Sequence, residues 1–338
     1  SHAAGVAGGT ASRCADITQV AQRDRGIALA ALAFLPAFTG WNTPYHRFAF
    51  GLGRRRVISQ GTDTGDEDAM ARTQTHIAEV DPIWARILDE AEAAVGDEPL
   101  LGGLIHQSVL HHPSLERALS YRISLKLASG EMSEQILREI CDEAYASEPA
   151  IASAARADIP AVYDRDPACH RFLQPLLFFK GFQAIQSYRI GHWLWHQGRR
   201  DMSYFIQMRV SEVFGIDIHP AARIGKGIMI DHAHSIVIGE TAVVGDNVSM
   251  LHSVTLGGTG KEEQDRHPKI GDGVLIGAGA KVLGNIRIGN CSRIAAGSVV
   301  LSEVPPCKTV AGVPARIVGE AGCDQPSMSM DQILKSGA

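Results

Sequence analysis

The sequence lacks the features that mark membrane proteins, zinc ribbons and nucleic-acid binders. Its 338 residues hold no apolar run of about 18 residues, the length of a membrane-spanning helix; the apolar stretch at 27–38 is short and contains Pro36. Its six cysteines form no CxxC pair, which argues against a zinc ribbon. A net charge of −5 supplies no excess of basic side chains. The composition therefore predicts a soluble globular protein with no nucleic-acid or membrane partner.

The first 60 residues differ in composition from the rest of the chain. They contain seven arginines, no lysine and only two acidic residues, Asp16 and Asp24, among many Ala, Gly, Ser and Thr residues. This composition is typical of an organellar transit peptide, and also of a disordered extension. We expect residues 1–74 to lie outside the folded part. The protein is then either cytoplasmic or, if the segment is a transit-peptide remnant, plastid or mitochondrial.

Residues 75–215 have the pattern of a helical domain. In 80–95, apolar residues recur at helical spacing after the start signal Asp81-Pro82. A second helix is expected from Ser114, and a third with Ser133 as its N-cap. The most apolar segment, 165–198, predicts two helices with a break near Pro175 or Gly181, and a last helix is expected at 200–215.

After Gly215 the pattern changes to a repeat of six residues. A fixed short period indicates a solenoid, in which each hexad is one short strand with a turn and three hexads close a triangular coil. The aliphatic residue of each hexad points into the coil, and small residues allow the tight corners. The repeated positions form three runs, separated by a two-residue slip and by a longer interruption: Ile218, Ile224, Ile230 and Ile236; Ile238, Val244, Met250 and Leu256; Ile270, Ile276, Val282, Ile288, Ile294 and Val300.

The predicted fold class is therefore α+β. An all-helical N-terminal domain at 75–215 precedes a left-handed parallel β-helix of hexapeptide repeats at 216–318, and a C-terminal tail follows at 319–338. The interruption at 257–269 is polar, Gly-rich and charged, so it must leave the coil as one protruding loop.

Histidine and carboxylate residues of the coil are candidates for chemistry. Imidazole is suited to take a proton near neutral pH, especially when a carboxylate holds its other nitrogen. His232 and His267 are candidate bases, with Asp217 and Asp231 as candidate partners. A metal site is the alternative, because His232 and His234 share one face of an extended strand, and His252 or His267 could supply a third ligand. The fold alone does not decide between an acyltransferase and a zinc-dependent carbonic anhydrase.

Several longer motifs resemble serine acetyltransferase, the family that makes O-acetylserine from L-serine and acetyl-CoA on the route to cysteine. The motifs are "DIHPAARIGKGIMIDHA", "IVIGETAVVGDNVSMLHSVTLGGTGK", "DRHPKIGDGVLIGAGAKVLGNIRIG" and "AGVPARIVG". The helical part is similar too, and the match runs from about Pro82 to Met330. The resemblance implies direct acetyl transfer by general-base catalysis, with no metal. Rival readings are a hexapeptide acetyltransferase with a sugar or antibiotic acceptor, and a non-catalytic scaffold.

The resemblance also implies roles for single residues. His232 is expected to be the general base and Asp217 its orienter. Asp231, together with Asp166 of "RDPA", is expected to bind the serine ammonium group, as cations pair with carboxylates.

The remaining expected roles concern the far end of serine and the coenzyme. Arg266 and His267 of "DRHP" are expected to bind the serine carboxylate, and His267 also to help hold the reacting hydroxyl. Acetyl-CoA is expected to lie along the coil edge near the small residues Gly258, Ala278 and Ala296.

Oligomers and partners are also expected by resemblance. Family sites form between neighbouring coils of a trimer, and the helical domain pairs two trimers. L-cysteine is the expected feedback inhibitor. Family members often bind O-acetylserine sulfhydrylase through a terminal isoleucine. This sequence ends "LKSGA", so the resemblance gives weaker support for that complex than for the substrates. The chain also has His234 where the family usually has a small residue.

Overall fold

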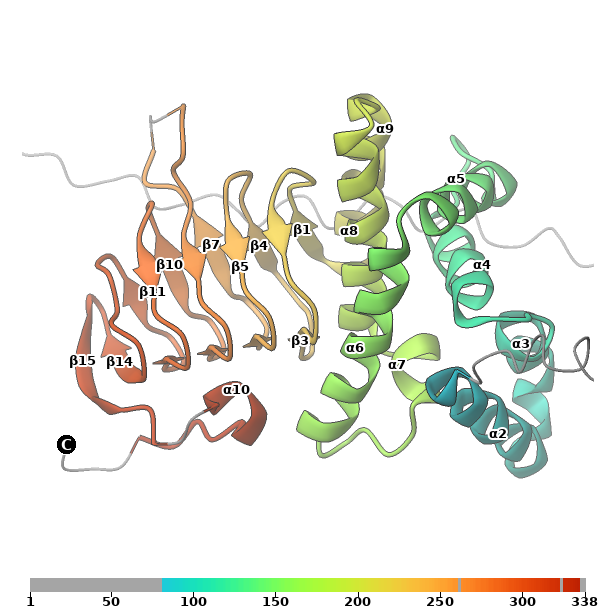
Figure 1. The fold of residues 1–338 in the computed structure, drawn as a ribbon, viewed down its shortest axis with the longest axis horizontal. Coiled ribbons are helices and arrows are strands. Elements are labelled where there is room, and N and C mark those ends of the chain that lie inside the picture. The colour runs from blue at the N-terminus through green and yellow to red at the C-terminus, as the bar shows by residue number, and fades with distance from the viewer. Residues whose placement is uncertain (1–80, 261–262, 323–324, 335–338) are drawn as a thin grey trace, which may run out of the picture. The chain divides into compact units, whose positions relative to one another are not determined.

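The computed structural model describes residues 81–260, 263–322 and 325–334 (Figure 1). These residues all belong to one compact unit, 67–338. The segment expected to be transit-peptide-like, 1–74, lies outside the described residues. In the described part of the chain, no helix is both long and apolar enough to cross a membrane.

The helical part begins at Pro82 and ends at Phe214, and Gly215 alone separates it from the first strand. The start signals are confirmed at two helices: the Asp81 carboxylate accepts from the backbone of Ile83, and the Ser133 hydroxyl from that of Ile136. The elements are α2 (Pro82–Asp97), η1 (Pro99–Leu101), α3 (Gly102–Ile105), η2 (His106–Leu110), α4 (Leu115–Leu127), α5 (Glu134–Ser147), α6 (Pro149–Arg165), α7 (Leu173–Leu177), α8 (Lys180–His196) and α9 (Arg200–Phe214).

The predicted break in the apolar segment lies at Phe178 and Phe179, between the two residues that the sequence suggested. Pro175 stays inside the short helix α7, and Gly181 lies in the first turn of α8. A Cβ on Gly181 would lie 2.1 Å from the Ile230 carbonyl oxygen, so only glycine lets α8 approach β3 this closely. The break therefore lets the chain change direction, so that α8 starts against the first coil.

The coil consists of three parallel sheets, as the hexad pattern predicts (Figure 1). The sheets have the orders β1-β4-β7-β10-β13, β2-β5-β8-β11 and β3-β6-β9-β12-β14-β15, and only β14 and β15 pair antiparallel. The strands are β1 (Ile216–Ile218), β2 (Arg223–Ile224), β3 (Met229–Ile230), β4 (Ile236–Ile238), β5 (Val243–Val244), β6 (Ser249–Met250), β7 (Thr255–Gly257), β8 (Lys269–Ile270), β9 (Leu275–Ile276), β10 (Lys281–Leu283), β11 (Arg287–Ile288), β12 (Arg293–Ile294), β13 (Val299–Val300), β14 (Lys308–Gly312) and β15 (Ala315–Glu320).

The aliphatic hexad positions form the interior of the coil. All of them are buried except Ile224, which is half-buried against the same core. The predicted loop leaves the coil between β7 and β8 and projects beyond the neighbouring turns (Figure 1). The alternation of one inward aliphatic with small corner residues thus accounts for the observed prism.

A buried ion pair fastens the helices to the first coil. The Asp158 carboxylate pairs with Arg189 at 2.7 Å and also accepts from the Ile228 backbone at 2.8 Å. Arg189 donates in turn to the Gly225 carbonyl at 2.9 Å. Removing one partner of such a pair leaves an unpaired buried charge, which lowers the free energy of unfolding by about 3–5 kcal/mol.

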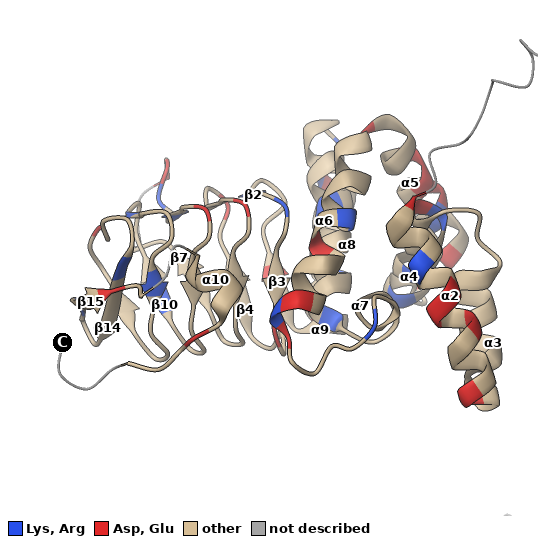
Figure 2. Ribbon diagram, turned by 60° about the horizontal axis from the view of Figure 1, so that its bottom comes forward, with Lys and Arg blue, Asp and Glu red and all other residues tan. Residues whose placement is uncertain are grey.

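The last described segment returns along the coil toward the helices. Helix α10 (Pro326–Ser329) contacts α6 and β9. The Ser249 hydroxyl donates to the Ser327 carbonyl at 2.9 Å, and Arg293 donates to the Asp331 carbonyl at 2.9 Å. Acidic and basic residues are mixed along both the helices and the coil (Figure 2).

Candidate functional site

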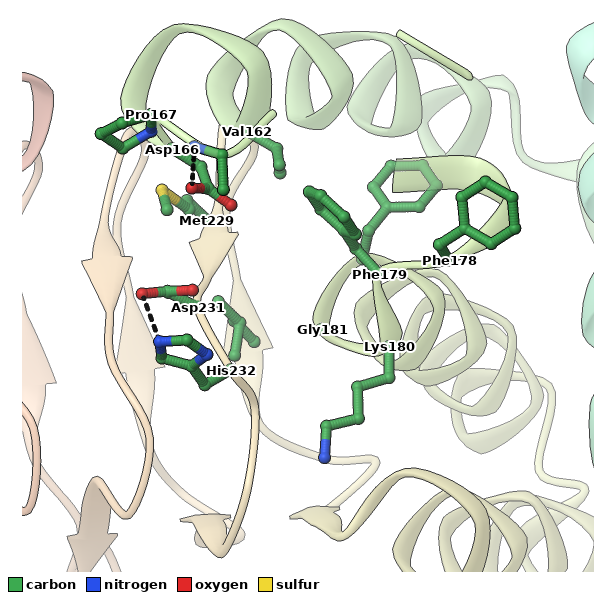
Figure 3. Close-up of a pocket in the computed structure, with 13 residues that line it drawn as sticks. Val162, Asp166, Pro167, Phe178, Phe179, Lys180, Gly181, Met229, Asp231 and His232 are labelled. Carbon is green, nitrogen blue, oxygen red and sulfur yellow. Dashed lines mark hydrogen bonds and ion pairs between the residues drawn. The ribbon is translucent and has the colours of Figure 1, made fainter. Parts of the chain in front are cut away.

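A pocket between the helices and the first coil brings three of the expected residues together. Its volume is about 530 Å³, and Asp166, Asp231 and His232 all line it (Figure 3). Asp166 caps the C-terminus of α6, while Asp231 and His232 directly follow β3. The other lining residues are Val162, Pro167, Ala168, Phe178, Phe179, Lys180, Gly181, Phe182, Met229 and Ile230. Two carboxylates and an imidazole therefore face one partly apolar cavity.

His232 is carried by a corner of the coil that is longer than its neighbour. Ile230 of β3 pairs with Met250 of β6, and Val237 of β4 pairs with Thr255 of β7. Six residues (231–236) connect the two paired positions in the first coil, but only four (251–254) connect them in the next. Regular hydrogen bonding resumes at the His234 carbonyl, so His232 and Ala233 are the two additional residues. The two-residue slip in the hexad pattern is this insertion. We call residues 231–235 the inserted corner.

The backbone of the inserted corner is strained. His232, Ala233 and Ser235 have φ angles of 55°, 56° and 56°, the left-handed region that non-glycine residues rarely adopt. Such conformations cost about 1 kcal/mol or more each. The equivalent corner of the next coil has one such residue, Ser253, whereas the inserted corner has three. The insertion lifts His232 off the coil, and its side chain is 71% exposed.

Two side chains contact the His232 ring. Its Nε2 lies 3.6 Å from the Asp231 carboxylate, and its ring centroid lies 5.8 Å from that of His252 in an edge-to-face arrangement. Asp217, the expected orienter, lies on β1 and accepts a hydrogen bond from Gln207 at 2.6 Å. Within the described residues, Asp217 and His232 are not in hydrogen-bond contact.

Arg266 and His267 lie at a different corner of the coil. Residues 239–242 follow β4 and residues 263–268 precede β8; together they form what we call the loop corner. Thr241 organises it, because its hydroxyl oxygen accepts from the backbone N–H of Arg266 at 3.0 Å and of His267 at 3.1 Å. The Arg266 guanidinium pairs with Glu240 at 2.6 Å, which lowers the pKa of that carboxyl.

The His267 ring is held firmly in the loop corner. Its Nδ1 accepts from the Thr241 backbone at 3.2 Å and lies 2.9 Å from the Thr241 hydroxyl. A Cβ on Gly239 would lie 2.0 Å from His267 Nε2, so glycine is needed where the ring packs. Burial, aided by the Arg266 charge, lowers the pKa of His267 and favours the uncharged ring. With Nδ1 as acceptor, the neutral ring carries its hydrogen on Nε2.

The two corners do not meet in one chain. Strand β4, three residues or roughly 10 Å of extended chain, separates the inserted corner from the loop corner. The structure therefore groups Asp166, Asp231 and His232 in the pocket, and holds Arg266 and His267 together elsewhere.

The positions expected to bind the coenzyme occupy two edges. Ala278 and Ala296 stack in successive coils at the edge that carries the inserted corner; the N–H after Ala296 donates to the Ala278 carbonyl. His252 and His234 continue this stack toward the helices, and we call the four residues the edge column. Gly258 lies apart, at the start of the protruding loop beside Arg266.

Some side chains of the site were not predicted from the sequence as parts of it. Lys180 lines the pocket, Gln207 holds Asp217, and Thr241 organises the loop corner. Only spatial neighbours distinguish Lys180 and Gln207 from other polar helix residues. For Thr241 the sequence offers one weak indication of a role in the site: it follows Gly239-Glu240 at a corner of the coil. In the described ranges, no three His, Cys, Asp or Glu side chains are grouped closely enough to hold a metal ion.

The coil and its corner residues first define a class, the hexapeptide-repeat transferases. The family profile described as "Bacterial transferase hexapeptide (six repeats)" matches residues 267–302, and "Serine acetyltransferase, N-terminal" matches residues 83–187. The serine acetyltransferase of Salmonella typhimurium is 56% identical over 254 residues, which is 75% of this chain and 93% of that protein. That of Escherichia coli K12 is 55% identical with the same coverage.

Solved structures agree with these relatives. Serine acetyltransferase from Brucella abortus in complex with coenzyme A is 56% identical with a TM-score of 0.72, covering 74% of this chain and all of that one. The Neisseria gonorrhoeae enzyme in complex with serine is 53% identical, TM-score 0.68, covering 72% and 100%. A serine acetyltransferase in complex with cysteine is 51% identical, TM-score 0.74, covering 75% and 98%.

The chain belongs to the serine acetyltransferase family. It is an acyltransferase, and its fold is the predicted helical domain followed by a left-handed β-helix of hexapeptide repeats.

Proposed function

We propose that the protein transfers acetyl from acetyl-CoA to the hydroxyl of L-serine, giving O-acetyl-L-serine and CoA, with His232 as general base. The observation that carries the proposal is the pocket in which Asp166 and Asp231 face an exposed imidazole. Two carboxylates at one end suit an ammonium group, and the imidazole beside them suits a hydroxyl that must lose its proton. A relative of 53% identity was solved in complex with serine, which supports this substrate.

Arg266 and His267 would complete the serine site from a second copy of the chain. The guanidinium of Arg266 can hold the serine carboxylate bidentately, and the hydrogen on His267 Nε2 can be donated to the reacting hydroxyl or the developing oxyanion. Because the inserted and loop corners are separated in one chain, a neighbouring coil must supply the second half. We therefore propose a trimer with sites between coils, paired through the helical domains into a hexamer.

The base would act on the serine hydroxyl as it attacks the thioester carbonyl. In the proposed mechanism the His232 ring turns toward β1, where Asp217 gives up its hydrogen bond from Gln207 and replaces Asp231 as the carboxylate partner of the ring. The exposure of the ring and its 3.6 Å distance from Asp231 support such freedom. Asp231 is then available to the substrate ammonium.

Transfer is proposed to be direct, without an acyl-cysteine. None of the residues that line the pocket is a cysteine. Cys169, which packs close by against Met229, has its pKa raised to about 11 by burial, and a protonated thiol is a poor nucleophile.

Acetyl-CoA would lie along the small-residue part of the edge column, with its pantetheine against Ala278 and Ala296. Small side chains let an extended ligand reach backbone groups. Gly258 would contribute from the neighbouring copy, since it lies beside Arg266 at the loop corner. The relative solved with coenzyme A supports this co-substrate.

L-cysteine is proposed to inhibit at the serine site. It shares the ammonium and carboxylate groups of serine, so Asp166, Asp231 and Arg266 would bind it in the same way, and a relative of 51% identity was solved with cysteine. A complex with O-acetylserine sulfhydrylase stays a prediction, since residues 335–338 lie outside the described part.

The test is a CoA-release assay with acetyl-CoA and, separately, L-serine, L-homoserine and a galactoside. The proposal expects turnover to be highest with L-serine and O-acetyl-L-serine to appear by mass spectrometry. Turnover highest with the galactoside would favour a sugar acetyltransferase. Stoichiometric zinc, with carbon dioxide hydration lost on chelation, would favour the carbonic anhydrase alternative.

A further inference from the structure

The edge column changes character at His252. Its members occupy one register position in successive coils, because the N–H after each donates to the carbonyl of the previous member: Gly279 to His252 at 2.9 Å and Ser253 to His234 at 2.6 Å. Ala278 and Ala296 are small, whereas His252 and His234 are large. The strip of small residues therefore ends at His252, one coil from the inserted corner.

His252 meets the ring of His232. The two ring centroids are 5.8 Å apart and the ring planes are inclined at 70°, within the range of favourable edge-to-face aromatic pairs. His252 Nδ1 is buried and has no hydrogen-bond partner among the described residues. The position of the His252 ring is therefore set by packing, since no side-chain hydrogen bond of this ring is found among the described residues.

Little else restrains the His232 ring. Its backbone lies in the strained inserted corner, its side chain is 71% exposed, and its one recorded polar contact is Asp231 at 3.6 Å, longer than a hydrogen bond. A base must be aligned with the proton that it removes, and a misplacement of about 1 Å can cost roughly a hundredfold in rate. His252 is the one described ring that packs against it.

We propose that His252 is a positioning residue for His232: its ring forms a wall behind the imidazole, at the point where the small-residue strip ends. This inference rests on the proposed role of His232 as the base. The wall limits the directions in which the exposed ring can turn, so that it points at the serine hydroxyl and not along the coil. His234 shares the column but has no recorded ring contact with His232, so it has no such role.

Two substitutions separate packing from polar chemistry. His252→Ala removes the wall, so kcat should fall by about tenfold while KM for serine and for acetyl-CoA changes by less than about twofold, because alignment matters in the transition state. His252→Phe keeps an aromatic ring and places C–H where Nδ1 has no partner, so kcat should stay within about threefold of the unchanged enzyme. The matched control, His111→Ala, removes an exposed histidine that follows η2 in the helical part, and it should leave kcat and both KM values unchanged.

The outcomes are distinct. Unchanged kcat in His252→Ala would overturn the proposal, and so would a His252→Phe variant as slow as His252→Ala, since a ring alone would then not suffice. Far-ultraviolet circular dichroism and gel filtration of each variant show whether fold and oligomer are kept; if His252→Ala does not fold, His252→Phe and His252→Leu are compared in its place. Full turnover in His232→Ala would instead remove the proposed base, and with it the function from which this inference starts.

Discussion

The two corners of the coil that carry the candidate residues are built in opposite ways. The inserted corner presents His232 on a strained backbone, mostly exposed, with one carboxylate at 3.6 Å and one ring beside it. The loop corner buries His267 to 7% exposure and fixes it through Thr241. Neither corner contains a complete serine site.

The difference between the corners suits two different tasks: an exposed imidazole for proton transfer at the inserted corner, and buried, fixed donors for substrate binding at the loop corner. A proton acceptor must be accessible to the hydroxyl that it deprotonates, whereas a carboxylate clamp benefits from donors that are aligned before the substrate arrives. Thr241 and Glu240 hold Arg266 and His267, the proposed clamp residues, in a fixed position. The same short coil can supply both because its two corners differ in length and in hydrogen bonding.

The largest effect is expected at the inserted corner. His232→Ala should lower kcat by about a thousandfold, because general-base catalysis contributes roughly 10²–10⁴ to the rate. Acetyl-CoA should still bind, since the small-residue strip remains. Steady-state kinetics and calorimetric titration with CoA check both parts; turnover near that of the unchanged enzyme would remove His232 from the mechanism.

The next largest effect is expected where glycine admits the His267 ring. Gly239→Ala should lower kcat/KM for serine by about a hundredfold, because a Cβ there would meet Nε2 at 2.0 Å and displace the ring from the clamp. Gly103→Ala, in α3 with no atom within 4 Å of the added Cβ, is the control and should have no effect. Equal activity of the two variants would show that the position of His267 is unimportant.

Removing the guanidinium should act on binding more than on rate. Arg266→Ala should raise KM for serine by about tenfold or more, with a smaller change in kcat, because a carboxylate clamp holds the ground state and the transition state alike. Glu240→Gln, which removes the ion-pair partner and keeps Arg266, is the comparison and should raise KM less. A KM for serine that is unchanged in Arg266→Ala would place the clamp elsewhere.

The smallest effect concerns stability against pH. Burial lowers the pKa of His267 and of His192 below the value of an exposed histidine. The unfolded chain then binds more protons, so this stability is complete above about pH 6.5 and is lost as the pH falls toward the lowered values. The thermal midpoint should be lower at about pH 5.5 than at about pH 7.5, and less so in His267→Gln. A midpoint that rises on acidification would contradict this.

The sequence predicted the repeat better than the site. Each hexad aliphatic is a local signal that burial in the coil then enforces. The slip between Ile236 and Ile238 reflects two additional residues, but the structure places them earlier, at His232 and Ala233. The sequence predicts no separate helix at α6, because its Ala-rich pattern with Pro160 in the interior shows little amphipathic periodicity. Its end nevertheless supplies Asp166.

The contacts between side chains could not be predicted from the sequence. Asp217 is the partner that the resemblance assigns to His232, but a hydrogen bond from Gln207, ten residues earlier on α9, occupies its carboxylate. The sequence suggested His252 only as a possible third ligand of a metal site, whereas its position in the register of the coil places its ring against that of His232. Both facts depend on which side chains neighbouring elements bring close, and no local pattern encodes them.

The most direct test of a site built from two corners on neighbouring copies is a mixing experiment. His232→Ala and Arg266→Ala chains are each purified, dissociated, mixed in equal amounts and reassembled. Serine acetylation is then measured at a serine concentration well below KM, where both variants are slow. If His232 of one copy works with Arg266 of the next, random reassembly restores up to about a quarter of the unchanged activity, since about one interface in four then has both residues. If the mixture is no more active than the average of its two components, each site lies within one chain and the account of two separate corners is wrong.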